Sequence, residues 1–127
     1  MSSRRAIRRA VAVTALLAGL AACGGDGVDY VEPAGPADAT VELDAGNFYF
    51  EPENVEAPAG IVEIEVTNVE SGEHTLVIED VDGFRIRVPG KGDTDALKVE
   101  LAPGTYEFWC DIPGHRSAGM EGELVVE

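Results

Sequence analysis

The stretch GTYEFWCDIPGHRSAGMEGELVV, residues 104–126, combines two strand patterns with an unusual loop between them. Apolar and polar residues alternate in the first half, so that every second residue up to Cys110 shares one face. A short apolar run, GELVVE, then closes the chain. The loop between the two runs holds Cys110, His115 and Met120, with a Pro-Gly turn just before the histidine. The stretch therefore predicts two β-strands joined by a loop that bends back toward the first strand.

The same alternation with a period of two continues through the chain from Thr40 onward. In IVEIEVTN (61–68), valine and isoleucine face one way, and glutamate and threonine face the other. Turn residues separate such runs at intervals of roughly 8–12 residues, and no segment shows a sustained helical period. We therefore predict that residues 40–127 form one domain, an all-β antiparallel β-sandwich of seven or eight strands.

Residues 1–22 have the layout of a bacterial signal peptide. Arginines within residues 4–9 precede a 13-residue apolar run (10–22), shorter than the roughly 20 residues that a membrane-spanning helix needs. LAAC (20–23) resembles the lipobox of lipoproteins, so we predict cleavage before Cys23 and a lipid that anchors it to a membrane. An ordinary signal peptide that leaves Cys23 as a free thiol is the alternative. Both the general and the twin-arginine export routes stay open.

Residues 23–39 follow the predicted cleavage site and are rich in Gly, Pro, Ala and Asp. This composition is typical of a flexible linker, whose ends would lie roughly 20–24 Å apart on average. We therefore expect a lipidated cysteine, then a tether, then the domain. This arrangement places the domain outside the cytoplasm, on the periplasmic or cell-surface side of a bacterial membrane.

The chain that remains after such cleavage is strongly acidic. It holds all 24 acidic residues but only five of the nine basic ones, and five minus 24 gives a formal net charge of −19. Such a surface repels nucleic acid and anionic lipid head groups. It favours a basic protein partner, although acidity that serves only solubility would give the same composition.

His74, Cys110, His115 and Met120 are the soft and borderline metal ligands of the predicted domain. One thiolate, two imidazoles and one thioether are the donor set of a blue-copper site, in which sulfur suits Cu(I) and imidazole suits Cu(II). Each residue alone has a plainer interpretation, as a surface histidine, a packing methionine or a buried apolar cysteine. Their joint position near strand ends favours a site for one copper ion.

The stretch 104–126 resembles the C-terminal signature of the plastocyanin/azurin family of cupredoxins. NFYFEPENVEAPAG (47–60), followed by an alternating strand, an asparagine and a histidine, resembles the N-terminal half of that family. The resemblance covers residues 40–127. It implies a Greek-key sandwich that binds one type 1 copper ion cycling between Cu(I) and Cu(II), with the ligand roles falling on His74, Cys110, His115 and Met120.

Two positions depart from the pattern of that family. The family commonly has Ser or Thr after the cysteine and often Asn after the first histidine, joined by a hydrogen bond, whereas this chain has Asp111 and Thr75. We expect the Thr75 hydroxyl to donate to the Asp111 carboxylate, because a charged acceptor strengthens a hydrogen bond. The alternative is an Asp111 side chain that points to solvent.

The resemblance also implies that His115 reaches the surface through an apolar patch where electrons pass to a partner. Arg116 would place a cation beside that patch, where it either selects an acidic partner edge or pairs with Glu121. Trp109 occupies the family's position for a second, more distant contact with a partner, or else simply packs against the sheet.

Together these features predict a membrane-tethered, extracytoplasmic blue copper protein that shuttles single electrons between redox partners. We expect a monomer, and a cytochrome or oxidase-like partner with a basic docking surface. A copper chaperone or buffer with the same ligands is the alternative. An enzyme is not expected, because a substrate-binding copper needs further histidines and the chain has two. A structural zinc site would leave Met120 without a purpose.

Overall fold

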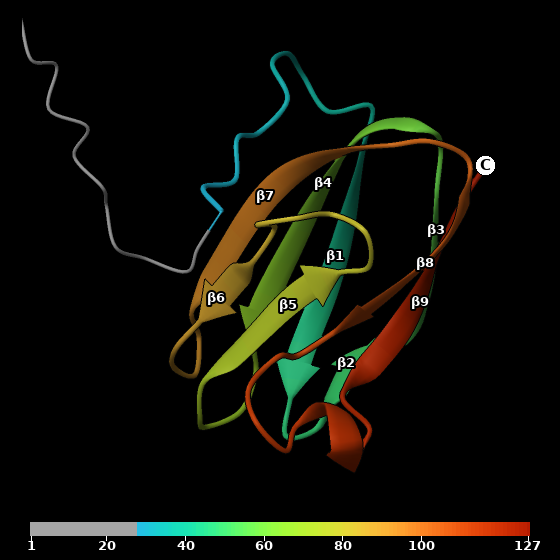
Figure 1. Cartoon of the computed structure of the whole chain (residues 1–127). Coiled ribbons are helices and arrows are strands. Elements are labelled where there is room, and N and C mark those ends of the chain that lie inside the picture. The colour runs from blue at the N-terminus through green and yellow to red at the C-terminus, as the bar shows by residue number, and fades with distance from the viewer. Residues whose placement is uncertain (1–27) are drawn as a thin grey trace, which may run out of the picture.

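A computed structural model describes residues 28–127 of the 127-residue chain as a β-sandwich (Figure 1). The predictions for a signal peptide in residues 1–22 and a lipid on Cys23 lie outside the described residues. No helix in the described part has the length and apolar character needed to cross a bilayer.

Residues 28–127 form one short 3₁₀ helix, η1 (Arg116–Ala118), and nine strands: β1 (Ala39–Gly46), β2 (Tyr49–Glu51), β3 (Asn54–Ala57), β4 (Gly60–Asn68), β5 (His74–Ile78), β6 (Ile86–Val88), β7 (Thr94–Leu101), β8 (Gly104–Trp109) and β9 (Glu121–Val126).

The strands form two sheets that share one core. The four-stranded sheet has the order β2-β1-β4-β7, and the five-stranded sheet has the order β3-β9-β8-β5-β6. Along β4 the alternation of the sequence becomes an alternation of burial, since Val62, Ile64 and Val66 each expose 2% or less. They belong to one apolar cluster with Leu76 and Phe108 of the five-stranded sheet. Removal of this apolar surface from water holds the two sheets together.

The predicted all-β sandwich is confirmed, with two corrections. β1 pairs with β4 in parallel, and so does β3 with β9, so the sheets are mixed and not purely antiparallel. After the β1–β2 hairpin the chain crosses to the other sheet as β3 and returns as β4, which runs in the same direction as β1. Residues 28–127 also form nine strands, and not seven or eight, because the short β2 and β3 are separate. Alternation shows which face of a strand is buried, but not the direction of its neighbour.

Residues 28–38, which we call the N-terminal strap, run along the four-stranded sheet before β1 (blue in Figure 1). The Tyr30 hydroxyl donates to the Lys98 carbonyl at 2.7 Å, and the Glu32 carboxylate accepts from the Lys98 amide at 2.6 Å. Because β7 is an edge strand, these bonds occupy backbone groups that no further strand pairs. The structure thus differs from the flexible tether predicted over residues 23–39: from Tyr30 onward, the segment is fastened to the domain.

Candidate metal centre

Three of the four predicted ligands meet at one end of the sandwich, beside η1. His74 begins β5, Cys110 directly follows β8, and His115 is the N-cap of η1. One ligand atom from each lies within 4.8 Å of the others. His115 Nδ1 is 3.5 Å from Cys110 Sγ, and the centroids of the two imidazole rings are 5.3 Å apart. The fold thus brings together side chains from three separate segments.

The imidazole ring of His74 is buried. The residue exposes 1% of its surface, and neither Nδ1 nor Nε2 of its ring has a partner among the described residues. Burial lowers the pKa of His74 and the neighbouring His115 lowers it further, whereas Glu70 acts in the opposite direction. Buried polar atoms are nearly always paired, and a neutral imidazole is the form that binds metals. With the Cys110 sulfur beside them, these two imidazoles fit a copper ion.

Met120 lies in the same loop as Cys110 and His115. The methionine is fully buried, its carbonyl accepts from the Cys110 amide at 3.1 Å, and its amide donates to the His115 carbonyl at 3.1 Å. These two bonds close the loop on itself. Gly119 makes the last bend with a φ of 108°, a conformation that favours glycine. The fourth predicted ligand is therefore a core residue whose backbone is bonded to the other two loop ligands, and its role as an axial ligand stays a prediction.

Thr75 and Asp111 form the predicted bridge between the two ligand segments. Thr75 Oγ1 donates to Asp111 Oδ1 at 2.7 Å, and the Asp111 amide donates back to Thr75 Oγ1 at 3.0 Å. Thr75 Oγ1 also lies 3.4 Å from Cys110 Sγ. A hydroxyl has a single proton, so its short bond to the carboxylate leaves the sulfur lone pairs available to a metal. The predicted hydrogen bond is confirmed, and the alternative of a solvent-directed Asp111 is wrong.

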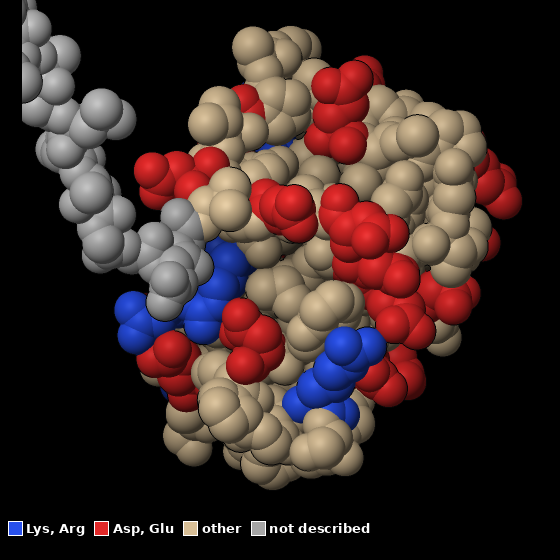
Figure 2. Space-filling model, viewed as in Figure 1, with Lys and Arg blue, Asp and Glu red and all other residues tan. Residues whose placement is uncertain are grey.

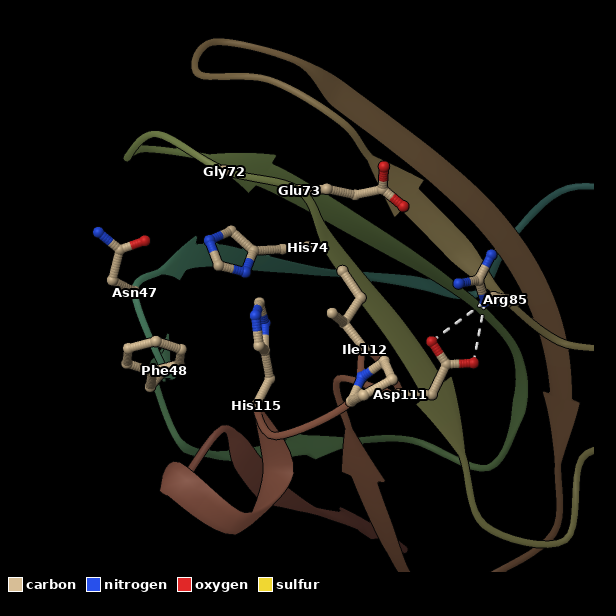
Figure 3. A pocket seen from close by; sticks show the side chains of 10 residues that line it. Asn47, Phe48, Gly72, Glu73, His74, Arg85, Asp111, Ile112 and His115 are labelled. Atoms are coloured by element: carbon tan, nitrogen blue, oxygen red, sulfur yellow. Dashed lines mark hydrogen bonds and ion pairs between the residues drawn. The ribbon is translucent and has the colours of Figure 1, made fainter.

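Arg85 forms an ion pair with the Asp111 carboxylate, a contact that was not predicted from the sequence. Arg85 Nε lies 3.1 and 2.9 Å from the two carboxylate oxygens, as the dashed lines in Figure 3 show. Burial is the largest influence on the pKa of Asp111 and raises it, but the hydrogen bonds from Arg85 and Thr75 and the charge of Arg85 together outweigh burial, so the pKa lies below its ordinary value. The carboxylate next to Cys110 is therefore ionised and partly compensated.

Asn68 organises the loop that leads to His74. It is fully buried, and its side-chain Nδ2 donates to the backbone carbonyls of Gly72 and Val88 at 2.7 and 3.0 Å. Its side-chain oxygen accepts from the Glu70 amide at 3.1 Å. This role was not predicted, although an asparagine between an apolar strand and a glycine-containing loop is a signal for such a turn.

An open pocket lies over the site. Figure 3 shows the rings of His74 and His115 pointing toward one another at its floor, with Phe48 on one side of His115 and Ile112 on the other. His115 is half-buried, whereas Cys110 is fully buried. Among the candidate ligands, His115 therefore links the buried sulfur to the surface.

Trp109 lies beneath the guanidinium of Arg116, whose central carbon is 4.0 Å from the ring centroid. Arg116 also pairs with Glu121 at 3.0 Å and with Glu107 at 3.1 Å. The predicted pair with Glu121 is thus confirmed. The cation covers part of the indole ring, so Trp109 packs locally, and its role in partner contact stays a prediction.

The charge distribution agrees with the acidic composition. Figure 2 shows acidic side chains spread over one face of the sandwich, with basic side chains in a few small groups. Two of the cations near the site, Arg85 and Arg116, are already paired with carboxylates. Exposed pairs of this kind contribute little to stability, so their main effect is on the local field.

The fold and this cluster define a cupredoxin. A family model described as a cupredoxin-like domain matches residues 10–126, and the chain belongs to that family. A dithionite-reduced auracyanin from the photosynthetic bacterium Roseiflexus castenholzii shares 21% identity and a TM-score of 0.64, over 72% of this chain and 99% of that one. Auracyanin B shares 23% identity and a TM-score of 0.65, over 80% of this chain and 96% of that one. At these identities the structures show a common fold. No curated protein sequence matches the chain.

Proposed function

We propose that this protein is a blue copper electron carrier. The observation that carries the proposal is the buried imidazole of His74, which has no hydrogen-bond partner among the described residues and has a ring nitrogen within 4.8 Å of the ligand atoms of Cys110 and His115. A bound copper ion would satisfy that imidazole and would take up and release one electron as Cu(II) and Cu(I). Met120 would be its weak axial ligand.

The contribution of the chain is to hold these ligands in one arrangement. The bridge from Thr75 to Asp111 joins the segments that carry His74 and Cys110, and two backbone bonds close the loop that ends at Met120. A ligand set fixed by its surroundings changes little when the charge at the site changes, which favours rapid electron transfer. We assign the exit route to His115, because it is the half-buried member of the set.

A copper chaperone or buffer with the same ligands is the second candidate, but burial favours the carrier. Cys110 and Met120 are fully buried and His74 exposes 1%, whereas metal exchange between proteins needs ligands that an acceptor can reach. An enzyme is disfavoured by the sequence, because both histidines of the chain already belong to this one site.

We also propose the setting in which the carrier works. A lipid on Cys23 would hold the protein at the extracytoplasmic face of a bacterial membrane as a monomer. The acidic surface would steer a redox partner with a basic docking surface, such as a cytochrome or oxidase-like protein. The rate of association with that partner is then expected to fall steeply as ionic strength rises, and a flat salt profile would remove steering from the proposal.

Copper loading tests the central proposal. Residues 24–127 would be purified, mixed with Cu(II) and examined by visible spectroscopy and voltammetry, alongside the Met120→Gln variant. We expect an intense blue colour, a reversible one-electron wave and a lower potential in the variant, because an amide oxygen favours Cu(II) more than a thioether does. Rapid transfer of Cu(I) to an acceptor protein would favour the chaperone. A sample that stays colourless would refute the blue copper site.

A further inference from the structure

Phe48 has a backbone conformation that bulky residues rarely adopt. It is the second of the two residues that connect β1 to β2, and its φ is 70°. Glycine or asparagine is favoured at such a position, because a large side chain crowds the backbone there. Within residues 28–127, Asp80 is the other non-glycine residue with positive φ, and aspartate tolerates it. A phenylalanine in this turn is therefore strained, and such strain is commonly retained at functional sites.

The strained turn places the ring of Phe48 against His115. The two ring centroids are 5.1 Å apart and the ring planes meet at 88°, an edge-to-face contact. Phe48 nevertheless leaves 46% of its surface exposed, so burial alone does not explain its position. The adjacent Tyr49 is similarly exposed, at 42%, but its ring lies against Gly46.

The turn is also fixed to the loop that precedes His74. The backbone N–H of Asn47 donates to the Glu70 carboxylate at 2.6 Å, which ties the β1–β2 hairpin to that loop. In Figure 3, Asn47 and Phe48 lie on the same side of the pocket, to the left of the two histidine rings. The position of the Phe48 ring is therefore set relative to both histidines.

We propose that Phe48 is a positioning residue for His115, an inference that rests on the proposed function of the site. Nδ1 of His115 faces the Cys110 sulfur at 3.5 Å, and the ring of His74 lies 5.3 Å away. The pocket leaves the outer side of His115 open, and the edge of the Phe48 ring limits rotation of the imidazole on that side. Phe48 thus holds the imidazole in its ligand orientation before a metal binds.

The experiment compares four full-length proteins: wild type, Phe48→Leu, Phe48→Tyr and the control Tyr49→Leu. Carbon-13 relaxation of the His115 ring in the metal-free protein measures its order. Release of Zn²⁺ to a chelator measures ligand positioning, since zinc binds cysteine and histidine whatever the redox role. We expect a more mobile His115 ring in Phe48→Leu and zinc release that is about two- to tenfold faster. This factor corresponds to the free energy that one aromatic pair contributes. Phe48→Tyr should restore both values, and Tyr49→Leu should leave them unchanged.

Two results would overturn the proposal. The first is a Phe48→Leu protein whose His115 ring is as ordered as in wild type and whose zinc release is unchanged. The second is an equal increase in His115 ring mobility and zinc release in Phe48→Leu and Tyr49→Leu. Urea unfolding of each variant establishes that it folds, and Phe48→Met replaces Phe48→Leu if the latter does not. Neither readout depends on copper. A protein that stays colourless with Cu(II) but loosens His115 in Phe48→Leu would therefore refute the proposed function and support the positioning role.

Discussion

The four-stranded sheet and the ligand end of the sandwich differ in whether their buried polar atoms have hydrogen-bond partners. In the sheet, Val62, Ile64 and Val66 of β4 are apolar and nearly inaccessible, and the buried Asn68 at the end of β4 has hydrogen-bond partners for its side-chain nitrogen and oxygen. At the ligand end, the equally buried His74 has no hydrogen-bond partner for either ring nitrogen within residues 28–127. The first region is complete as folded protein, whereas the second becomes complete when a ligand satisfies its polar atoms. Stability and metal binding are therefore expected to respond to different mutations.

The largest expected effect is the loss of the copper site in Cys110→Ser. Replacement of the thiolate by a hydroxyl removes the soft donor that a blue copper site needs, so the variant should show no intense blue colour with Cu(II). Its metal-free form should keep most of its stability, because the substitution is nearly isosteric. Visible spectra with Cu(II) and urea unfolding of the metal-free protein measure the two effects, and a retained intense colour would contradict the assignment of Cys110.

Ile64→Ala should give the reverse result. Removal of a buried isoleucine side chain from a close-packed core lowers the free energy of unfolding by about 2–5 kcal/mol. Ile64 exposes 2% of its surface and lies in the four-stranded sheet, so the variant should still bind copper with the wild-type spectrum while it remains folded. Urea unfolding of the metal-free protein gives the loss. A changed copper spectrum below the unfolding transition would show that the two regions are coupled.

Two threonine hydroxyls, one in each region, sharpen the comparison. Thr75 both donates to and accepts from Asp111, so Thr75→Val leaves the Asp111 amide without its partner and should lower the free energy of unfolding by about 1–3 kcal/mol. Thr67 is the matched control, since its hydroxyl contacts that of Thr94 at 2.8 Å on the exposed side of the four-stranded sheet. Thr67→Val should change stability by less than about 0.5 kcal/mol.

Urea unfolding and the reduction potential of the copper-loaded protein distinguish these two variants. The potential should move in Thr75→Val, because the bridge next to Cys110 is broken, and should stay constant in Thr67→Val. Equal losses of stability in the two variants, with no change in potential, would mean that the bridge does not support the site.

The sequence predicted the buried face of one region and the ligand residues of the other from two different signals. The alternation in IVEIEVTN identifies the buried face of β4 because burial there depends only on local periodicity. The donor chemistry of Cys110, His115 and Met120 identifies the loop because these residue types are scarce and share one segment. Neither signal gives the direction of a neighbouring strand, which is why the parallel pairing of β1 with β4 was not predicted.

Polar contacts between residues far apart in the sequence also escaped prediction. Arg85 and Asp111 are 26 positions apart, Asn47 and Glu70 are 23 apart, and Tyr30 and Lys98 are 68 apart. A surface pattern shows each of these residues as polar but does not show its partner, because the partner is set by the packing of the sheets. The Thr75–Asp111 bridge was predicted because the resemblance to cupredoxins placed both residues beside ligands.

The smallest expected effect tests the strap along the four-stranded sheet. Tyr30→Phe removes the hydrogen bond to the Lys98 carbonyl and should lower the free energy of unfolding by about 0.5–1.5 kcal/mol at neutral pH. Burial raises the pKa of Tyr30 above its ordinary value of about 10, and Glu32 raises it further. The folded protein therefore holds this proton more tightly than the unfolded chain does. The stabilisation is complete below the unfolded pKa and is lost as pH rises through the folded pKa.

The difference in stability between wild type and Tyr30→Phe should consequently shrink on the alkaline side, and urea unfolding between pH 7 and pH 11 measures it. Tyr49→Phe is the control, because Tyr49 is an exposed tyrosine at the other end of β1. A difference that stays constant across this range would show that the Tyr30 hydroxyl does not stabilise the strap. Since the strap lies on the region that is complete without a ligand, the copper spectrum should be the same in both variants.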